Sequence, residues 1–365
     1  MTSVLVTNAL DRAALAVVRD LGRGGHTVFG AADRASPLGL RSRYCRAHLV
    51  MPTARPAAEL AERAAAAGVE VVLPMGSPDV LRLARARPLL ARRFALTFPT
   101  EAAVRHAYDK RRTHDLCRRL GIAVARLVEG GDHPDAVVVK PRYDLGGARG
   151  VRYFAHVAAA RRAAGPDDLL CEYVPGPAGA MRAATLLFDR RSRLVAWFTL
   201  RKIRQYPARG GLAALVESSR EPALVEAVLP FFDHLRWQGP AEVEFKIDAR
   251  CGTPRVIEIN PRLPGYVRYF LDCGLHLPRL LVEAACGRVT SPTGYVAGRR
   301  MLNPGVYLKL CRQLLAEEGS AACLRAAREA VGARWGHPAD IVDPAPRLAK
   351  LLLRSIVAPA DDPPS

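Results

Sequence analysis

The chain has 365 residues, half of them apolar, and a formal net charge of +19 at pH 7. A chain of this length and composition can bury two or three cores, which excludes a disordered protein. No segment approaches the roughly 18 uninterrupted apolar residues of a membrane span, and the N-terminal residues lack the basic start and long apolar run of a signal peptide. We therefore expect a globular protein that stays in the cytoplasm.

The positive charge comes mostly from arginine, because only six of the 54 basic residues are lysines. Such a charge can mark a protein that binds nucleic acid or an anionic membrane surface. Here the basic residues are spread over the whole chain, and few aromatic residues lie among them to stack on bases. We therefore expect no nucleic-acid partner, while a peripheral membrane contact stays open. The eight cysteines show no zinc-binding spacing, and we expect them to be reduced thiols.

Short apolar runs alternate with amphipathic stretches over the first hundred residues. Strand character is seen at residues 4–7, 27–31 and 69–74, and helical spacing at residues 11–24 and 56–67. This alternation predicts βαβ units on a parallel sheet. The first strand-to-helix turn contains no Gly-x-Gly-x-x-Gly, so the fingerprint of a dinucleotide site is absent. The sequence thus predicts a Rossmann-like domain without a Rossmann cofactor.

The pattern changes after residue 100. We expect helices over residues 101–120 and 221–236, strands over 123–128 and 136–140, and two β-hairpins, formed by 183–188 with 194–200 and by 241–247 with 255–259. The region after residue 289 is less clear. Its amphipathic stretch at 348–357 is expected to pack against the body of the protein, with contact to a surface as the alternative.

The second hairpin carries acidic residues that face each other. Polar and apolar residues alternate along residues 241–248, so Glu242 and Glu244 lie on one face of the strand. In a symmetric hairpin Glu244 lies opposite Glu258, and Glu242 lies opposite Asn260. Opposed Cβ atoms are only about 5 Å apart, and like charges there are destabilising. A Mg²⁺ ion would relieve this repulsion, because it binds one or two carboxylates together with phosphates and waters. The alternative is a solvated hairpin face.

A second feature points to phosphate. An apolar strand ends in Lys140 and runs into a turn that contains Gly146, Gly147 and Gly150. Glycine lets backbone N–H groups approach phosphate oxygens closely, and a lysine supplies a point charge to them. No Gly-Lys-Ser/Thr follows, so the turn is not a Walker A loop. A strand-borne lysine is informative in a chain with so few lysines.

Taken in order, these residues resemble the ATP-grasp superfamily over most of residues 1–290. The resemblance implies two nucleotide lysines, a glycine-rich loop over the phosphates, and a hinge whose Cys171 carbonyl and Val174 N–H read the adenine. The implied nucleotide-binding residues are Lys110, Lys140, Gly146, Gly147, Gly150, Cys171, Glu172 and Val174, and the implied metal ligands are Glu244, Glu258 and Asn260.

The resemblance also implies a division of the chain and an activity. The expected parts are a Rossmann-like preATP-grasp domain at 1–104, an ATP-grasp small lobe at 105–176, a large lobe with the metal site at 177–290, and a C-terminal helical extension at 291–365. The fold class is α/β, with α+β character in the two-lobed ATP-grasp part. The implied activity is that of a stand-alone carboxylate-amine ligase akin to one half of carbamoyl-phosphate synthetase. ATP and Mg²⁺ are the expected cofactors, with Mn²⁺ as an alternative metal.

Such a ligase activates a carboxylate as an acyl phosphate and joins it to an amine. Arg262, with Arg201 and Arg204, is a candidate for holding the carboxylate, because a guanidinium can bind it bidentately. For Arg201 and Arg204 a solvated strand end is the alternative. The expected partners are small-molecule carboxylates and amines, and a homodimer stays open. Two other interpretations are another ATP-dependent transfer, kinase-like or through carboxyphosphate, and a basic nucleic-acid or membrane-surface protein with a vestigial nucleotide site.

Two positions depart from the family pattern. Pro177 and Ala178 follow the hinge glycine, where relatives often carry a glutamate for the ribose. Leu212 follows a pair of glycines, where relatives often have serine. The sequence therefore leaves the ribose contact open and predicts a different acceptor pocket.

Overall fold

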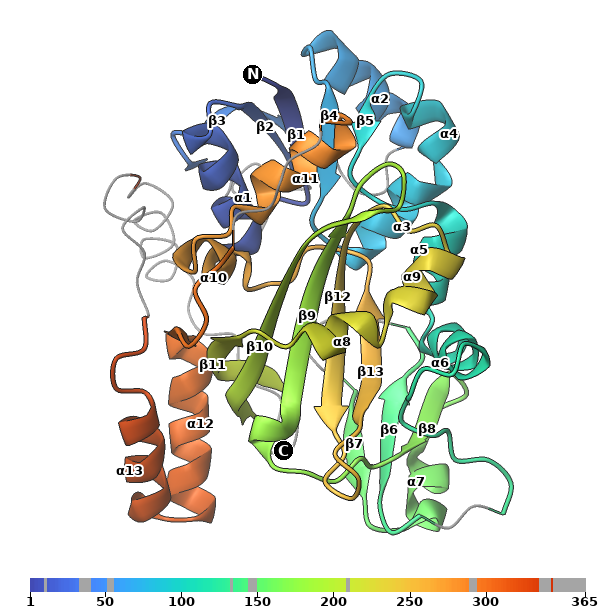
Figure 1. Cartoon of the computed structure of the whole chain (residues 1–365), viewed down its shortest axis with the longest axis vertical. Helices are drawn as coiled ribbons and strands as arrows, with labels where there is room; N and C mark the ends of the chain where they lie inside the picture. The colour runs from blue at the N-terminus through green and yellow to red at the C-terminus, as the bar shows by residue number, and fades with distance from the viewer. Residues whose placement is uncertain are drawn as a thin grey trace.

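The computed structural model contains three β-sheets with helices packed around them (Figure 1). The residues described are 1–9, 12–32, 41–50, 56–131, 134–143, 150–207, 211–288, 294–334 and 343. The first sheet is parallel and the other two are antiparallel. The predicted α/β class, with an antiparallel second part, is therefore confirmed.

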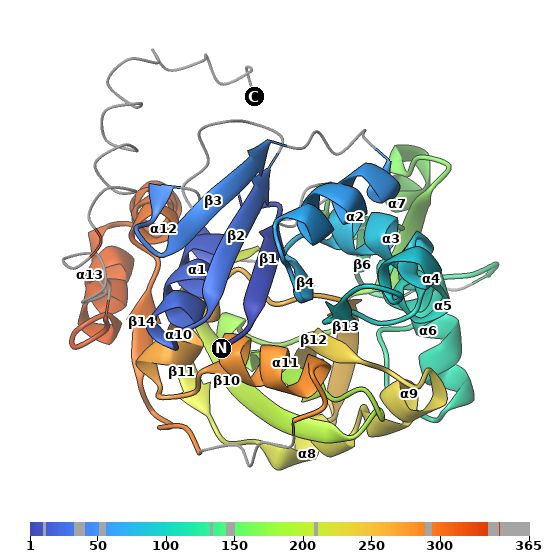
Figure 2. The ribbon, with the colours of Figure 1, turned by 90° about the horizontal axis from the view of Figure 1, so that it is seen from above.

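The N-terminal sheet has the strand order β3-β2-β1-β4-β5. Its elements are β1 (Ser3–Thr7), α1 (Arg12–Arg23), β2 (Thr27–Ala32), β3 (Cys45–Val50), α2 (Ala57–Ala66), β4 (Val71–Pro74), α3 (Ser77–Arg85), α4 (Arg87–Leu90) and β5 (Ala95–Leu96). Val4 and Val6 of β1 pack in a core with α1, whereas Leu5 packs in a second core with α2 and α3. Both faces of β1 are thus buried, which explains its continuous apolar run. In Figure 2 α1 lies next to α10 (Val267–Asp272) and α11 (Leu277–Ala285).

The helix expected at 101–120 is interrupted. It consists of α5 (Glu101–Tyr108) and α6 (Lys110–Arg119), with extended backbone at Asp109 between them. The Asp109 carboxylate accepts hydrogen bonds from the N–H groups of Arg111 and Arg112, at 3.0 and 3.4 Å. A single helix was a wrong prediction because aspartate stabilises a helix start more than a helix interior. Lys110 is therefore the first residue of a helix.

The small sheet has the order β7-β6-β8 and is covered by α7 (Val157–Ala163). Its strands are β6 (Val137–Pro141), β7 (Arg152–Phe154) and β8 (Asp168–Glu172). The strand expected at 123–128 is absent among the elements described there. This segment makes only isolated bridges, from Val124 to Val256 and from Leu127 to Cys171. It runs from one sheet to the other, so neither sheet gives it a continuous partner.

The largest sheet has the order β13-β12-β9-β10-β11-β14. Its elements are β9 (Met181–Phe188), β10 (Leu194–Tyr206), β11 (Leu212–Ser219), α8 (Pro222–Glu226), α9 (Leu229–His234), β12 (Gly239–Ile247), β13 (Pro254–Asn260) and β14 (Arg300–Leu302), with a short 3₁₀ helix at Ala178–Ala180. The helix expected at 221–236 is the pair α8 and α9. One face of the sheet packs with these helices through Phe231, Phe232 and Val243. The opposite face packs with α1, α10 and α11.

The C-terminal region contributes more than the expected helices. Strand β14 pairs with β11, and α12 (Pro304–Glu317) and α13 (Ser320–Glu329) lie beside that edge (Figure 1). Further along, the buried carboxylate of Asp343 accepts hydrogen bonds from Arg19 and Ser42 of the N-terminal domain, at 2.9 and 2.5 Å. The amphipathic stretch at 348–357 lies outside the described residues. Among the helices that the structure describes, none combines the length and apolarity needed to cross a bilayer.

The hairpin of β12 and β13 has the expected register at its acidic end. Glu244 pairs with Glu258 and Glu242 pairs with Asn260, as predicted. Closer to the turn the register shifts by one, so Phe245 lies opposite Val256. The shift leaves the alternation of β12 intact, since Phe245 is buried in the core with α9.

The turn of this hairpin is held by Asp248, whose side chain is fully buried. Arg250 and Arg255 both donate to its carboxylate, with the shortest contacts at 2.8 and 2.7 Å. These arginines, led by Arg250, hold the pKa of Asp248 well below its usual range. A carboxyl with a lower pKa in the folded state stabilises the protein above its unfolded pKa of about 4. That stabilisation is lost as the pH falls through the folded value.

We predict that Asp248→Asn lowers the free energy of unfolding by about 2 kcal/mol at pH 7, because charged hydrogen bonds are lost. The deficit should shrink as the pH is lowered from about 5 toward 2, because the Asp248 carboxyl of the unfolded wild-type chain, with a pKa of about 4, becomes protonated over this range. Thermal melts of both proteins across this range measure the effect. A deficit that stays constant down to the lowest pH would contradict the assignment of the stabilisation to the carboxylate charge.

Candidate active site

Four polar side chains of the β12–β13 hairpin form one surface, which we call the acidic face. Its members are Glu242, Glu244, Glu258 and Asn260. Asn260 Nδ2 donates to Glu258 Oε1 at 3.1 Å and to Glu242 Oε2 at 3.4 Å. Glu242 is nearly fully buried, and this burial raises its pKa to about 7. Glu244 and Glu258 are half-buried and directly opposed, so their charges need a cation close by.

A lysine that the sequence analysis missed supplies part of this charge. Lys202 of β10 is buried, and its Nζ lies 3.0 and 2.9 Å from the two carboxylate oxygens of Glu244. Burial alone would lower the pKa of Lys202, but the charge of Glu244 outweighs burial and the pKa is raised. The ammonium group therefore stays protonated and places a positive charge beside Glu244. The sequence pointed to its neighbours Arg201 and Arg204 as candidate site residues, but Lys202 is the residue that faces the carboxylates.

The two predicted nucleotide lysines reach the same hairpin from the small lobe. Lys110, at the start of α6, has its Nζ 3.7 Å from Glu258 Oε2. Lys140, on β6, donates to the Ile257 carbonyl at 3.0 Å. A fourth lysine, Lys246, is buried beside the acidic face. Four of the six lysines in the chain therefore meet where the small sheet faces β12 and β13.

This concentration has a physical reason. A lysine ammonium is a compact point charge on a flexible stem, whereas a guanidinium is a planar fork. Most cationic positions in this chain are arginine, so the retained lysines mark places where a point charge is needed. Phosphate oxygens and closely spaced carboxylates are such places.

The hinge residues lie on the side of the small sheet that faces Lys246. Cys171 and Val174 are buried, and Cys171 is within β8. The Glu172 carboxylate pairs with Arg250 at 2.5 Å and with Arg126 at 3.4 Å. Its charge is thus used to join the hinge to the hairpin turn.

Lys246 closes this end of the site. Its Nζ donates to the Tyr173 hydroxyl at 3.1 Å and lies 4.2 Å from the centre of the Tyr173 ring. Tyr173 also contacts Tyr153 edge to face, with ring centroids 6.0 Å apart. The hinge, the small sheet and the acidic strand β12 are therefore joined through one lysine, which the sequence analysis did not assign a role.

Of the three loop glycines, the structure describes one. Gly146 and Gly147 lie outside the described residues. Gly150 has a φ of +76°, and a Cβ there would come within 2.7 Å of Pro141 Cγ. Only glycine fits this position, which returns the chain from the loop to β7.

An ion pair ties together the two elements that carry the nucleotide lysines. Arg142 follows β6, and its guanidinium donates to both carboxylate oxygens of Asp109, at 2.9 and 2.7 Å. Burial would raise the pKa of Asp109, but Arg142 outweighs it and the pKa is lowered. Stacking of Tyr108 on Tyr143, with centroids 5.9 Å apart, supports the same junction. Lys110 directly follows Asp109 in the sequence, and Lys140 is two residues before Arg142.

The donor set of the acidic face fits Mg²⁺. Two opposed carboxylates and a carboxamide are hard oxygen ligands, and Mg²⁺ in proteins commonly takes one or two carboxylates, with phosphates and waters completing its shell. Among the described residues no group of three or more His, Cys, Asp and Glu side chains is arranged to enclose a metal. The face thus suits an ion that brings its own phosphate and water ligands better than a permanently enclosed metal.

Arg262 connects the acidic face with the N-terminal domain. Its Nε donates to Ser77 Oγ at 3.1 Å, at the start of α3, and an Nη lies 3.5 Å from Glu242 Oε2. Arg262 therefore lies at the end of the site where the parallel sheet meets the large lobe. It is the one predicted acceptor residue that the structure brings to the acidic face.

Comparison with solved structures finds similar chains of low sequence identity. N5-carboxyaminoimidazole ribonucleotide synthetase from Thermotoga maritima is 16% identical, with a TM-score of 0.65 over 83% of this chain and 81% of that one. L-amino acid ligase from Bacillus licheniformis is also 16% identical, with a TM-score of 0.62 over 82% and 78%. The biotin carboxylase domain of Hydrogenobacter thermophilus 2-oxoglutarate carboxylase is 17% identical, with a TM-score of 0.64 over 82% and 72%. No protein-family model and no curated protein sequence matches the chain.

The chain has the ATP-grasp fold. In this fold the three-stranded sheet is the small lobe, and the six-stranded sheet is the large lobe that carries the acidic face. Function has to be argued from the site, because one fold can support different reactions.

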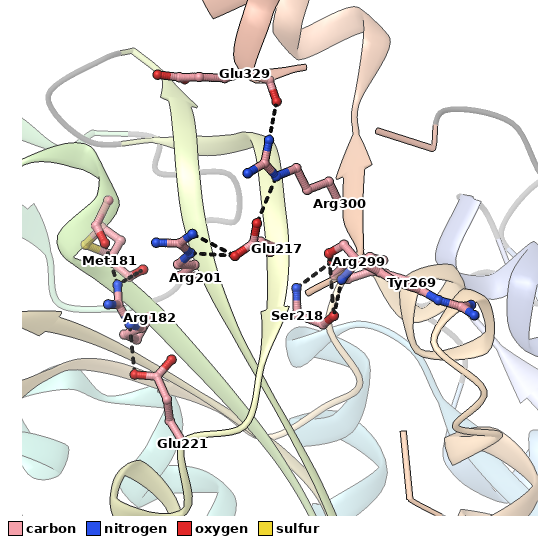
Figure 3. Close-up of polar contacts among 11 residues, drawn as sticks. Met181, Arg182, Arg201, Glu217, Ser218, Glu221, Tyr269, Arg299, Arg300 and Glu329 are labelled. Atoms are coloured by element: carbon pink, nitrogen blue, oxygen red, sulfur yellow. Dashed lines mark hydrogen bonds and ion pairs between the residues drawn. The ribbon is translucent and has the colours of Figure 1, made fainter. Parts of the chain in front are cut away.

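Two predicted site residues of the ATP-grasp large lobe point away from the acidic face. Arg201 donates twice to Glu217 Oε1, at 2.9 and 2.7 Å, as Figure 3 shows. Arg204 forms a bidentate pair with Glu329 of α13, at 2.7 and 3.0 Å. Neither guanidinium is brought to Glu244 or Glu258. Successive residues of a strand point to opposite faces, so Lys202 occupies the face that Arg201 does not.

We predict that Asp109→Ala lowers the free energy of unfolding by about 2 kcal/mol, because α6 loses its N-cap and Arg142 loses its partner. Asp109→Asn is the matched variant, since asparagine also caps helices but carries no charge. It should cost about 1 kcal/mol, the contribution of the charge to the Arg142 contact. Urea unfolding of the three proteins gives these values. Equal stability of wild type and Asp109→Ala would show that neither contact holds α6.

Proposed function

We propose that the protein is an ATP- and Mg²⁺-dependent ligase that activates a carboxylate and joins it to an amine. The observation that carries the proposal is the meeting of Lys110 and Lys140, from the small lobe, with Glu244 and Glu258 of the large lobe. Cations from one lobe and paired carboxylates from the other form a site suited to a metal-bound polyphosphate. The solved structures of the same fold support this, because one of them is a biotin carboxylase domain dimer in complex with MgADP, ADP and bicarbonate.

The roles of the residues follow from their charges and places. Lys110, Lys140 and the loop around Gly150 would bind the phosphates, and the hinge at Cys171 and Val174 would bind the adenine. Glu244, Glu258 and Asn260 would bind the metal. Mg²⁺, when bound, neutralises charge on the phosphates and between the facing carboxylates. Lys202 would hold the Glu244 carboxylate in place beside the metal through its contacts with both oxygens.

The carboxylate substrate would bind near Arg262. Its oxygen attacks the γ-phosphorus of ATP, giving an acyl phosphate and ADP. The amine then attacks the acyl carbon, phosphate leaves, and the amine loses a proton as the amide forms. Positioning and charge neutralisation supply most of the catalysis in such a phosphoryl transfer. Arg262 would contribute to both, since it is held toward the acidic face by Ser77 of the N-terminal domain.

The substrates can be found by measuring ADP release over a panel of carboxylates crossed with amines, with bicarbonate and with no amine as two of the arms. We expect ADP formation that requires both a carboxylate and an amine, with an amide as the product. A phosphorylated acceptor without an amide would contradict the ligase proposal and favour a kinase-like transfer. ADP release with bicarbonate alone would favour a carboxyphosphate-forming enzyme.

We predict that Glu258→Gln lowers Mg²⁺-dependent ATP turnover by at least about a hundredfold, since charge stabilisation at the phosphates is lost. The melting temperature should change little, because removing one of two opposed carboxylates also removes repulsion. Glu283→Gln is the matched control, because Glu283 lies on α11 away from the acidic face and forms an ion pair with Arg288, and it should keep wild-type turnover. Undiminished turnover in Glu258→Gln would refute the metal assignment.

A further inference from the structure

The strand that carries Lys202 has an irregular register at that point. Lys202 pairs with Val216 and Gln205 pairs with Ala213, but between them Arg204 pairs with Leu215, so the register is locally irregular and then recovers. Like a β-bulge, a local irregularity in the pairing changes the direction of the side chains next to it. The direction of Lys202 toward Glu244 therefore depends on how this short segment of β10 is held.

Contacts from β11 and β14 hold the segment on its N-terminal side. Arg201 is paired with Glu217 of β11, and Arg300 of β14 donates to the other oxygen of Glu217 at 2.8 Å (Figure 3). Burial would raise the pKa of Glu217, but the two arginines outweigh it and the pKa is lowered. Glu217 thus remains charged and links the residue before Lys202 to the C-terminal strand.

Helix α13 holds the segment on the other side. Its residue Glu329 binds Arg204 bidentately, and its carbonyl oxygen accepts a hydrogen bond from Arg300 at 3.0 Å. Bidentate guanidinium–carboxylate pairs fix orientation as well as distance. The helix is itself fixed, because Ala322 and Ala326 pack with Leu310 and Leu314 of α12 over β11.

The two pairs therefore lie on either side of the irregular segment of β10. Arg201 and Arg204 lie on either side of Lys202 and Ile203. Arg204 is paired with Glu329 of α13, and Arg201 is paired with Glu217, which also binds Arg300 of β14. A lysine stem is flexible, so a fixed backbone on both sides limits where its ammonium group can go. The pairs provide this constraint without touching the acidic face.

We propose that β14 and α13 are a positioning device for Lys202, acting through the Glu329–Arg204 and Glu217–Arg201–Arg300 contacts. The inference rests on the proposed function, since it gives the C-terminal region a role in metal and nucleotide binding. Glu329 and Arg204 are positioning residues and do not touch the substrates.

The test is calorimetric binding of MgADP to the full-length protein. Residues that orient metal ligands from outside typically change metal affinity by 10- to 100-fold when mutated, so Glu329→Gln should weaken MgADP binding by about tenfold. Arg204→Gln should have the same effect by removing the other partner. Glu317→Gln is the matched control on the same helical hairpin, because the exposed Glu317 carboxylate accepts hydrogen bonds from Gln313 of its own helix, at 3.1 and 3.2 Å. It should bind MgADP like the wild type.

A double-mutant cycle separates positioning from general stabilisation. If Glu329 acts through Lys202, Glu329→Gln should weaken MgADP binding in the wild type but add little to Lys202→Met. Additive losses, or a lower melting temperature with unchanged MgADP affinity, would overturn the proposal. A wild-type protein that binds no MgADP would instead refute the proposed function, so the two failures are distinguishable.

Discussion

The structure depends on how three carboxylates are kept together on one face of a hairpin. Glu242, Glu244 and Glu258 lie within one pair of strands, where like charges repel at short distance. The protein limits this repulsion in two ways. Glu242 is buried and its pKa is raised to about 7, whereas Glu244 and Glu258 each have a lysine nearby. The lysines come from different lobes, so the two halves of the ATP-grasp fold are held against each other by the same charges that suit a metal-bound nucleotide.

Lysine and arginine have different roles in binding the carboxylates of this protein. Arginines build the supporting pairs, such as Arg142 with Asp109 and Arg255 with Asp248, in which a planar fork meets a carboxylate. Lysines meet the acidic face and the hinge, where a small, strongly hydrated charge can be displaced or shared when a ligand arrives. Most of the net charge of +19 is thus carried by arginine, because only six of the 54 basic residues are lysines.

Several features could be predicted from sequence because they depend on local rules. Strict alternation along β12 gave the acidic face and its pairing, since a strand has a side-chain period of two. Lys202 could not be found in this way, because it stands among Arg201 and Arg204 where the pairing of β10 with β11 is locally irregular. Strand β14 has three residues and depends on distant partners, β11 on one side and Arg334 on the other. The break between α5 and α6 had a local signal, because Asp109 is a residue that favours a helix start. The helical spacing that runs on from residue 101 to residue 120 concealed this signal.

The position of the C-terminal contacts has a consequence for how the site is made during synthesis. Glu329 binds Arg204 of β10, and Arg300 binds Glu217, the partner of Arg201. Asp343 accepts hydrogen bonds from Arg19 and Ser42 of the N-terminal domain, more than 300 residues earlier in the sequence. These contacts close very long loops, whose formation is slow compared with local pairing. A ribosome-bound chain that has emerged only to residue 290 would contain every predicted nucleotide and metal ligand, yet β10 would lack its outer support. Competence to bind nucleotide should therefore appear late in translation, after the ligands themselves are in place.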